Sequence, residues 1–174
     1  SAEKTIVDLF VAFTRRMRDE VGVKFQTVVW RAEHADYEGV VSVKNSAGQT
    51  GASLAAAGEA VVGQTSLGAG DEGPALIPWV TGILAGCAVN QSNMNRLYDG
   101  EYAVDTGCTQ AELEQALQNG EFVLHRVDDQ VRVLDDVNTL VTVSAEKSAD
   151  FQSNQTIRVL DQIAADIASL FVTK

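Results

Sequence analysis

The first twenty-one residues place apolar side chains with the period of an α-helix. Five of them share one helical face because they recur at spacings of three and four residues: Ile6, Phe10, Phe13, Met17 and Val21. Charged residues occupy much of the remaining surface, and Gly22 is a typical residue for ending a helix. The pattern predicts an amphipathic helix over residues 3–21 whose apolar face packs against the rest of the domain.

Two valine-rich stretches follow, and neither has the strict alternation of a half-exposed strand. Thr27 to Trp30 and Val40 to Val43 are mainly β-branched or aromatic, which favours strands covered on both faces. Residues 122–127 and 131–134 flank a polar turn, as the two strands of a hairpin do. We expect three strands to share one sheet: those near 26–30, 39–44 and 122–127.

Helices alternate with these strands, and Pro78 is well suited to begin one because its missing N–H has no partner in a first turn. We expect the helices over 3–21 and 78–90 to pack on the sheet. The order of elements predicts an α/β fold, a layered sandwich with a mixed β-sheet flanked by helices.

The remaining segments are more varied. Residues 46–74 hold seven of the fourteen glycines, which favours a surface loop or insertion with at most a short helix over 54–62. Thr109 followed by Glu112 is a capping-box pattern and predicts the start of a helix. Residues 148–174 repeat apolar positions at helical spacing and predict a long final helix.

Composition argues against several kinds of partner. The formal net charge is −11, and no strong basic patch interrupts the acidic balance, so we expect no contact with nucleic acid. The apolar stretches are shorter than the roughly 20 residues that a membrane span needs. Cys87 and Cys108 are too few for a disulfide framework, and we expect reduced structural thiols.

Patterns of catalytic and ligand-binding residues are missing from the sequence. His34 and His125 have no partner at metal-ligand spacing, and neither a nucleophile elbow nor a phosphate-binding loop occurs. The acidic pairs Asp128/Asp129 and Asp135/Asp136 are expected to be solvated turn residues. We therefore expect no catalytic residue, no metal site and no cofactor.

Four stretches resemble motifs of contractile phage tail sheath proteins, and they occur in the same order. Residues 79–92 read WVTGILAGCAVNQS, and residues 16–25 read RMRDEVGVKF. Residues 36–43 read DYEGVVSV, and residues 137–140, VNTL, are followed by IRVLDQI at 157–163. A single motif of this kind would be weak, but four collinear ones indicate a sheath subunit.

The resemblance implies a structural role. Such subunits stack as hexameric rings around a tail tube and contract to drive the tube through a target cell envelope. Their expected partners are other sheath subunits, the tail tube and the baseplate, in a virion tail or tail-like particle assembled in the bacterial host cytoplasm. The family's core resembles subtilisin in fold but carries no protease site.

The resemblance also implies a division of the chain. Residues 1–136 would form the subtilisin-like α/β core, with 46–74 as an insertion, and residues 137–174 would begin a C-terminal α+β domain. Because the chain lacks an initiator Met and remains helical in pattern up to Lys174, we expect it to be part of a longer polypeptide.

The final helix carries the one candidate interface. Its polar face is proposed to point toward the tail tube: Arg158, Asp161, Gln162, Asp166 and Ser169. Its apolar face is expected to pack on the subunit's own core: Ile157, Leu160, Ile163, Ile167 and Leu170.

Two other interpretations remain open from the sequence. One is a small α/β enzyme or ligand-binding domain, catalytically inactive or of an unrecognised kind, which the missing Ser/His/Asp arrangement argues against. The other keeps the sheath but places it in an R-type bacteriocin or another injection particle, which the sequence does not separate from a phage.

Overall fold

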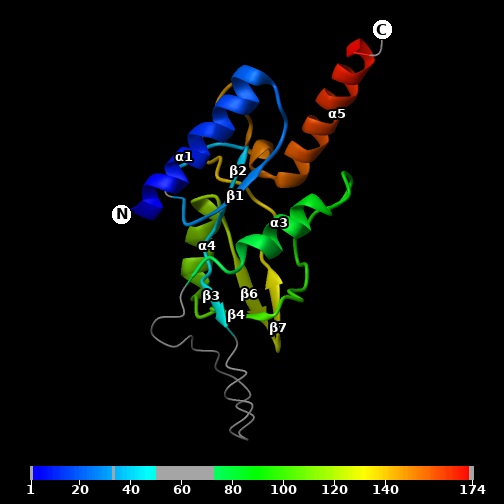
Figure 1. Cartoon of the computed structure of the whole chain (residues 1–174). Coiled ribbons are helices and arrows are strands. Elements are labelled where there is room, and N and C mark those ends of the chain that lie inside the picture. The colour runs from blue at the N-terminus through cyan, green and yellow to red at the C-terminus, as the bar shows by residue number, and fades with distance from the viewer. Residues whose placement is uncertain (1, 33, 50–72, 173–174) are drawn as a thin grey trace, which may run out of the picture.

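The computed structural model describes residues 2–32, 34–49 and 73–172, and its helices surround a small parallel sheet (Figure 1). The helices are α1 Ala2–Arg16, α3 Ile77–Ala85, α4 Gln110–Gln118 and α5 Asn154–Val172, with a π-helical turn η1 Met17–Val21 and a 3₁₀ turn η2 Ala149–Gln152. The strands are β1 Thr27–Trp30, β2 Val40–Val43, β3 Ala47–Gln49, β4 Tyr102–Val104, β5 Glu121–Phe122, β6 Leu124–Val127 and β7 Gln130–Val133.

The central sheet has the order β1-β2-β5, and all of its pairings are parallel. Every residue of β2 is buried, as the uninterrupted valine run predicts. Val29 and Val40 face α1, whereas Val41 and Val43 face α3. The sheet is therefore covered by one helix on each side, and the predicted α/β sandwich is confirmed.

The expectation of one sheet for three strands is only partly correct. Residues 121–122 pair with β2, but residues 124–127 leave the sheet and form an antiparallel hairpin with β7. Asn45 explains the break, because its side-chain amide accepts from the Leu124 N–H at 2.7 Å and donates to the Leu124 carbonyl at 2.9 Å. Beyond Phe122, these two side-chain hydrogen bonds take the place of the backbone hydrogen bonds that would continue the pairing of β2 with β5.

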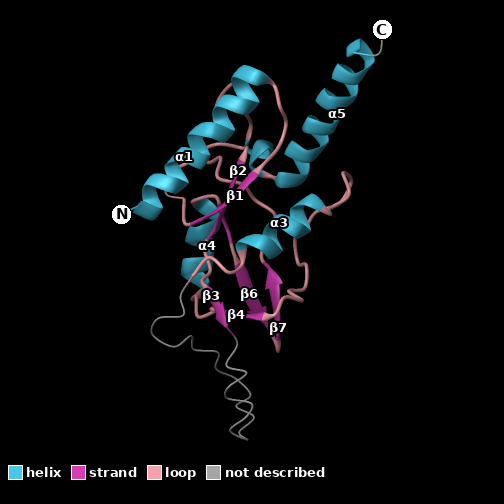
Figure 2. Ribbon diagram, viewed as in Figure 1, coloured by secondary structure: helices cyan, strands magenta, loops and turns pink. Residues whose placement is uncertain are grey.

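The small antiparallel pairs β3–β4 and β6–β7 lie at the end of the molecule opposite α5 (Figure 2). β3 is the described beginning of the glycine-rich stretch 46–74, and most of that stretch, including the short helix considered over 54–62, lies outside the described residues. Within the described ranges, none of the helices combines the length and apolarity that crossing a membrane requires.

Helix α1 is present as predicted, and Gly22 ends the following π-helical turn with a φ of 82°. The predicted apolar face is nevertheless wrong, because Ile6, Phe10 and Phe13 are each more than half exposed. The face toward the sheet consists of other residues at the same helical spacing: Val7, Val11 and Thr14 on α1, continued by Arg18 on η1. Both faces satisfy the helical period, so spacing alone could not choose between them.

Helix α4 begins with the predicted capping box. The Thr109 hydroxyl accepts from the Glu112 N–H, and the Glu112 carboxylate accepts from the Thr109 N–H at 2.7 Å. The helix is followed by Gly120 with a φ of 69°, where the chain turns into β5. A Cβ at this position would lie 2.7 Å from the Asn138 carbonyl oxygen and 2.9 Å from Thr139 Cα.

We expect Gly120→Ala to lower the free energy of unfolding by about 2 kcal/mol, because it combines an unfavourable left-handed φ with contact against rigid backbone. Gly82→Ala is the matched control. A Cβ at Gly82 meets no atom within 4 Å, so alanine should raise helix stability by about 0.5–1 kcal/mol. Urea unfolding followed by circular dichroism measures both, and equal effects of the two substitutions would contradict the prediction.

Candidate assembly site around helix α5

Arg18 connects the first helical segment to the last one. It lies on the turn η1, and its side chain is only 5% exposed. Its Nη1 and Nη2 donate to the two carboxylate oxygens of Asp161 at 2.7 and 2.8 Å, and Nη1 also donates to the Phe25 carbonyl at 2.6 Å. The planar guanidinium matches the carboxylate, so this bidentate pair fixes α5 against residues near the start of the chain.

The electrostatics keep Arg18 charged inside the protein. Burial alone would lower the pKa of Arg18, but the hydrogen bonds and charge of Asp161 outweigh burial and raise that pKa above its ordinary value. Gly39 provides the space for the side chain, because a Cβ there would lie 2.5 Å from Arg18 Cδ and 2.7 Å from Tyr37 Cε1. Position 39 in the DYEG stretch is therefore a glycine because any larger residue would collide with the Arg18 side chain packed against it.

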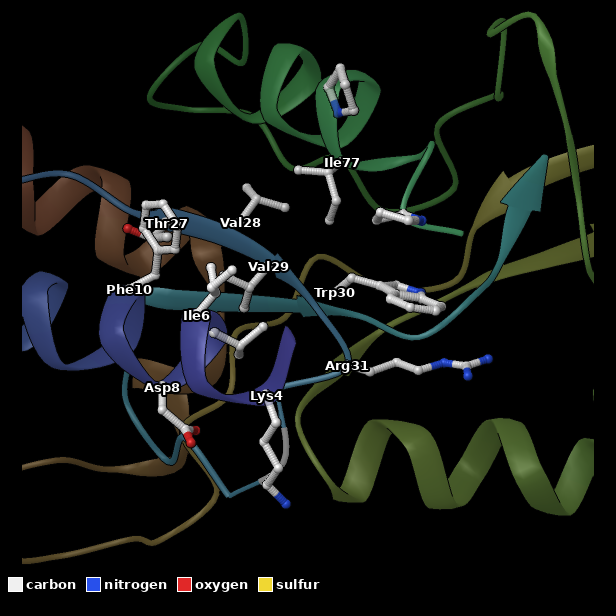
Figure 3. Close-up of a pocket in the computed structure, with 13 residues that line it drawn as sticks. Lys4, Ile6, Asp8, Phe10, Thr27, Val28, Val29, Trp30, Arg31 and Ile77 are labelled. Carbon is white, nitrogen blue, oxygen red and sulfur yellow. The ribbon is translucent and has the colours of Figure 1, made fainter. Parts of the chain in front are cut away.

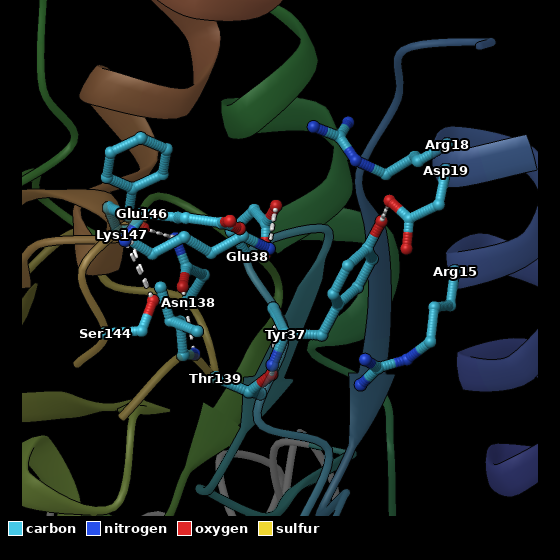
Figure 4. Close-up of polar contacts among 12 residues, drawn as sticks. Arg15, Arg18, Asp19, Tyr37, Glu38, Asn138, Thr139, Ser144, Glu146 and Lys147 are labelled. Atoms are coloured by element: carbon cyan, nitrogen blue, oxygen red, sulfur yellow. Dashed lines mark hydrogen bonds and ion pairs between the residues drawn. The ribbon is translucent and has the colours of Figure 1, made fainter. Parts of the chain in front are cut away.

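Tyr37 is the second buried group of this site. Its hydroxyl donates to Asp19 at 2.7 Å, and the Arg15 guanidinium lies 4.5 Å from the ring centroid (Figure 4). Burial, together with the hydrogen bond and charge of Asp19, raises the pKa of Tyr37 far above its ordinary value. Tyr37 therefore stays a neutral hydrogen-bond donor and holds η1 beside β2.

The segment between β7 and α5 makes hydrogen bonds to Tyr37 and Glu38. The Thr139 hydroxyl donates to the Tyr37 carbonyl at 2.9 Å and accepts from the Tyr37 N–H at 3.2 Å. Lys147 binds both carboxylate oxygens of Glu38 at 2.8 Å, and Figure 4 shows this side of the cluster facing away from Asp19. Stretches 16–25, 36–43 and 137–140, which carry the sequence resemblance, therefore meet in space.

A second ion pair lies at the base of α5. Asp136 is 1% exposed on its side chain and pairs with Arg158 at 3.2 Å. It also accepts from the Asn93 N–H and from the side-chain amide of Asn154, both at 2.9 Å. The expectation that Asp135 and Asp136 are solvated turn residues is therefore wrong for Asp136. Its carboxylate is buried and pairs with the guanidinium of Arg158, 22 residues later in the sequence.

Beyond Asp161 the helix extends away from the body of the molecule (Figure 1). Ile157 is buried as expected, with 2% exposure. The prediction that the rest of the apolar face packs on the subunit's own core is wrong, because these side chains are between 41% and 73% exposed: Leu160, Ile163, Ile167 and Leu170. The helix is longer than the surface it rests on, so only its first two turns are covered.

The five residues of the candidate tube-facing surface fall into two groups. Arg158 and Asp161 make the two intrachain ion pairs described above. Gln162, Asp166 and Ser169 lie on the exposed part of the helix, where Gln162 donates to the Asp166 carboxylate at 2.7 Å and Ser169 donates to the Asp166 carbonyl. Sequence reasoning found the helix and its polar residues but missed Arg18. Its only hint in the sequence is helical spacing from Val7 and Val11, and the structure was needed to show that this face is the buried one.

The described residues offer little for catalysis. His34 is exposed, and His125 is half-buried in β6 opposite Arg132. No three His, Cys, Asp or Glu side chains gather as a metal site in the part of the chain that the structure describes. Cys87 and Cys108 are unpaired thiols, and burial raises the pKa of Cys108, which disfavours a reactive thiolate.

Comparison with known proteins gives a consistent result. The sequence profile of the phage tail sheath protein central domain matches residues 1–139. The protein YqbK of Bacillus subtilis strain 168 is 34% identical over 92% of this chain, and the phage-like element PBSX protein XkdK of the same strain is 35% identical over 91%. In each case the chain spans 31% of the relative's length.

Solved structures agree with the sequence relatives. A sheath tail protein from Desulfitobacterium hafniense matches 97% of this chain and 37% of its own, with a TM-score of 0.81 and 36% identity. A sheath tail protein from Listeria innocua matches 91% of this chain and 33% of its own, with a TM-score of 0.75 and 37% identity. Fold and sequence thus lead to the same assignment, and the chain belongs to the phage tail sheath protein family.

Proposed function

We propose that this chain is part of a structural subunit of a contractile tail sheath. The subunit polymerises with copies of itself as stacked hexameric rings around a tail tube, and contraction drives the tube through a target cell envelope. The observation that carries the proposal is the match of residues 1–139 to the sheath central domain. The role is mechanical rather than enzymatic.

The geometry of α5 suits a part that transmits force between subunits. Two ion pairs of low exposure, Arg18–Asp161 and Arg158–Asp136, hold the base of the helix at a fixed angle to the sheet. The distal part exposes an apolar face that includes Ile163 and Ile167, and a polar face that includes Asp166. The apolar face would pack on other parts of the sheath, and the polar face would contact the tail tube.

The same proposal sets the place of action. The relatives include a tail sheath protein of a Clostridium phage, 33% identical over 37% of this chain, and the PBSX protein named above. The subunit would therefore be assembled in the bacterial host cytoplasm and would lie in the tail of a virion or of a tail-like particle, with the baseplate as a further partner. An R-type bacteriocin is one such particle.

Deleting the gene that encodes this chain from a particle-producing host tests the function directly. We expect electron microscopy to show tail tubes without a sheath, because the proposed subunit is the building block of that polymer. Complementation with the intact gene should restore the sheath and is the control. Fully sheathed tails in the deletion strain would refute the proposed role.

Asp161→Asn should lower the free energy of unfolding by about 3 kcal/mol, because it leaves the buried Arg18 guanidinium without its counter-charge. Asp166→Asn makes the same chemical change on the exposed part of the same helix and should alter stability by less than about 0.5 kcal/mol. Thermal and urea unfolding measure both. Equal stability of the two variants would mean that the Arg18–Asp161 pair does not anchor α5.

The tube contact requires a substitution that spares this anchor. Gln162→Lys combined with Asp166→Lys reverses the exposed polar face, and we expect sheaths that assemble without a tube or contract prematurely. Each exposed ion pair contributes only about 0.2–1 kcal/mol, so a ring of six can hold the extended state and still release it. Asp129→Lys, in the exposed β6–β7 turn, is the matched charge control. Normal extended tails from the double variant, with an unchanged melting temperature of the domain, would exclude this surface.

A further inference from the structure

A groove of about 720 Å³ runs along the outer edge of β1, between α1 and α3 (Figure 3). Most of the side chains along it are apolar, and six of them define its walls and floor: Ile6, Phe10, Val28, Trp30, Ile77 and Pro78. The apolar face of α1 that sequence spacing placed against the core therefore faces this groove instead. Such a surface is a typical place for another part of a protein to pack.

The floor of the groove is an unpaired strand edge. The N–H groups of Thr27, which begins β1, and of Arg31, which directly follows it, donate toward β2. Their acceptors are the carbonyls of Gly39, directly before β2, and of Val43, at its end, at 2.9 and 3.0 Å. Because successive residues of a strand point their backbone groups to opposite sides, the N–H and C=O groups of Val28 and Trp30 face the groove. Neither residue makes a backbone hydrogen bond on that side within the described part of the chain.

The shape of the groove fits one more strand. Val29 packs toward α1 and Val28 packs toward α3, so the two helices cover opposite faces of β1. Both helices also extend past its edge, where Ile6 and Phe10 on one side face Ile77 on the other (Figure 3). A strand placed about 4.8 Å from β1 would lie between these two apolar walls. Its side chains would be buried on both faces, as parallel sheets require.

The direction of α1 indicates where that strand comes from. Figure 3 shows Phe10 beside Thr27 and Lys4 beside Arg31, so the helix runs antiparallel to β1. A segment directly preceding α1 would therefore have to end near the carboxyl end of β1. Parallel neighbours joined by a helical crossover have this arrangement. The relatives provide enough polypeptide, since this chain spans about a third of their length.

We propose that the segment directly N-terminal to residue 1 in the full-length polypeptide forms an apolar β-strand in this groove, parallel to β1. It would hydrogen-bond to the main chain of Val28 and Trp30 and complete a β–α1–β1 unit. The central sheet would then have four strands, and the exposed face of α1 would be covered within the subunit. This inference goes beyond the proposed function and does not depend on it.

Residue-resolved amide exchange tests the pairing, on residues 1–174 and on the same chain extended through the preceding segment. Extension should slow exchange at the Val28 and Trp30 amides by more than about tenfold, since each gains a buried hydrogen bond. The Val29 and Arg31 amides point to β2 and should be protected in both proteins, which provides an internal control. Unchanged exchange at Val28 and Trp30 would overturn the proposal. Protection that appears only as the extended chain oligomerises would overturn it too, because a neighbouring subunit would then supply the strand.

A pair of variants tests the same contact without exchange data. Val28→Pro removes the groove-facing N–H, and Val28→Ala removes the same packing but keeps the N–H. In the extended chain the proline variant should melt more than about 5 °C below the alanine variant, whereas in residues 1–174 the two should melt together. Equal melting of both variants in the extended chain would contradict a strand paired at Val28.

Discussion

The buried pair between Arg18 and Asp161 imposes requirements on several distant parts of the chain. Removing two charges from water costs several kcal/mol per ion, and only close bidentate geometry with further hydrogen bonds offsets that cost. The pair therefore needs the Phe25 carbonyl as a second acceptor and a glycine at position 39, where a Cβ would collide with the arginine. It also needs the first turns of α5 at one fixed place, which the Arg158–Asp136 pair secures from the other side.

The second constraint is the smallness of the parallel sheet. β2 is buried on both faces, but β1 has one unpaired edge and β5 contributes only two residues. Asn45 ends the ladder on the β5 side by satisfying the backbone of Leu124 with its own amide. On the β1 side no described residue does the same. The two sides of the sheet thus differ, one being closed by a side chain and the other being open to a further strand.

The buried ion pair and the open sheet edge separate internal contacts that hold the domain together from exposed surfaces that are free to bind other polypeptide. The polar cluster near Tyr37 is internal and orients α5, whereas the distal turns of α5 and the outer face of α1 are exposed and apolar in part. A subunit that works by assembly needs exposed surfaces of this kind, held in place by rigid internal contacts. The described residues show both: close internal ion pairs at the base of α5, and exposed apolar side chains beyond them.

Sequence by itself determined the elements that depend on neighbours along the chain. The helix ending at Gly22, the capping box at Thr109 and the buried run of β2 follow from local spacing and chemistry, and four collinear motifs indicated the family. The tertiary structure decided which face of α1 is buried, because two faces of that helix fit the same period. It also decided that Asp136 and Arg18 are internal and that most of α5 is not. A charge is buried or exposed according to whether its counter-charge lies opposite in space, and that partner can be 143 residues away.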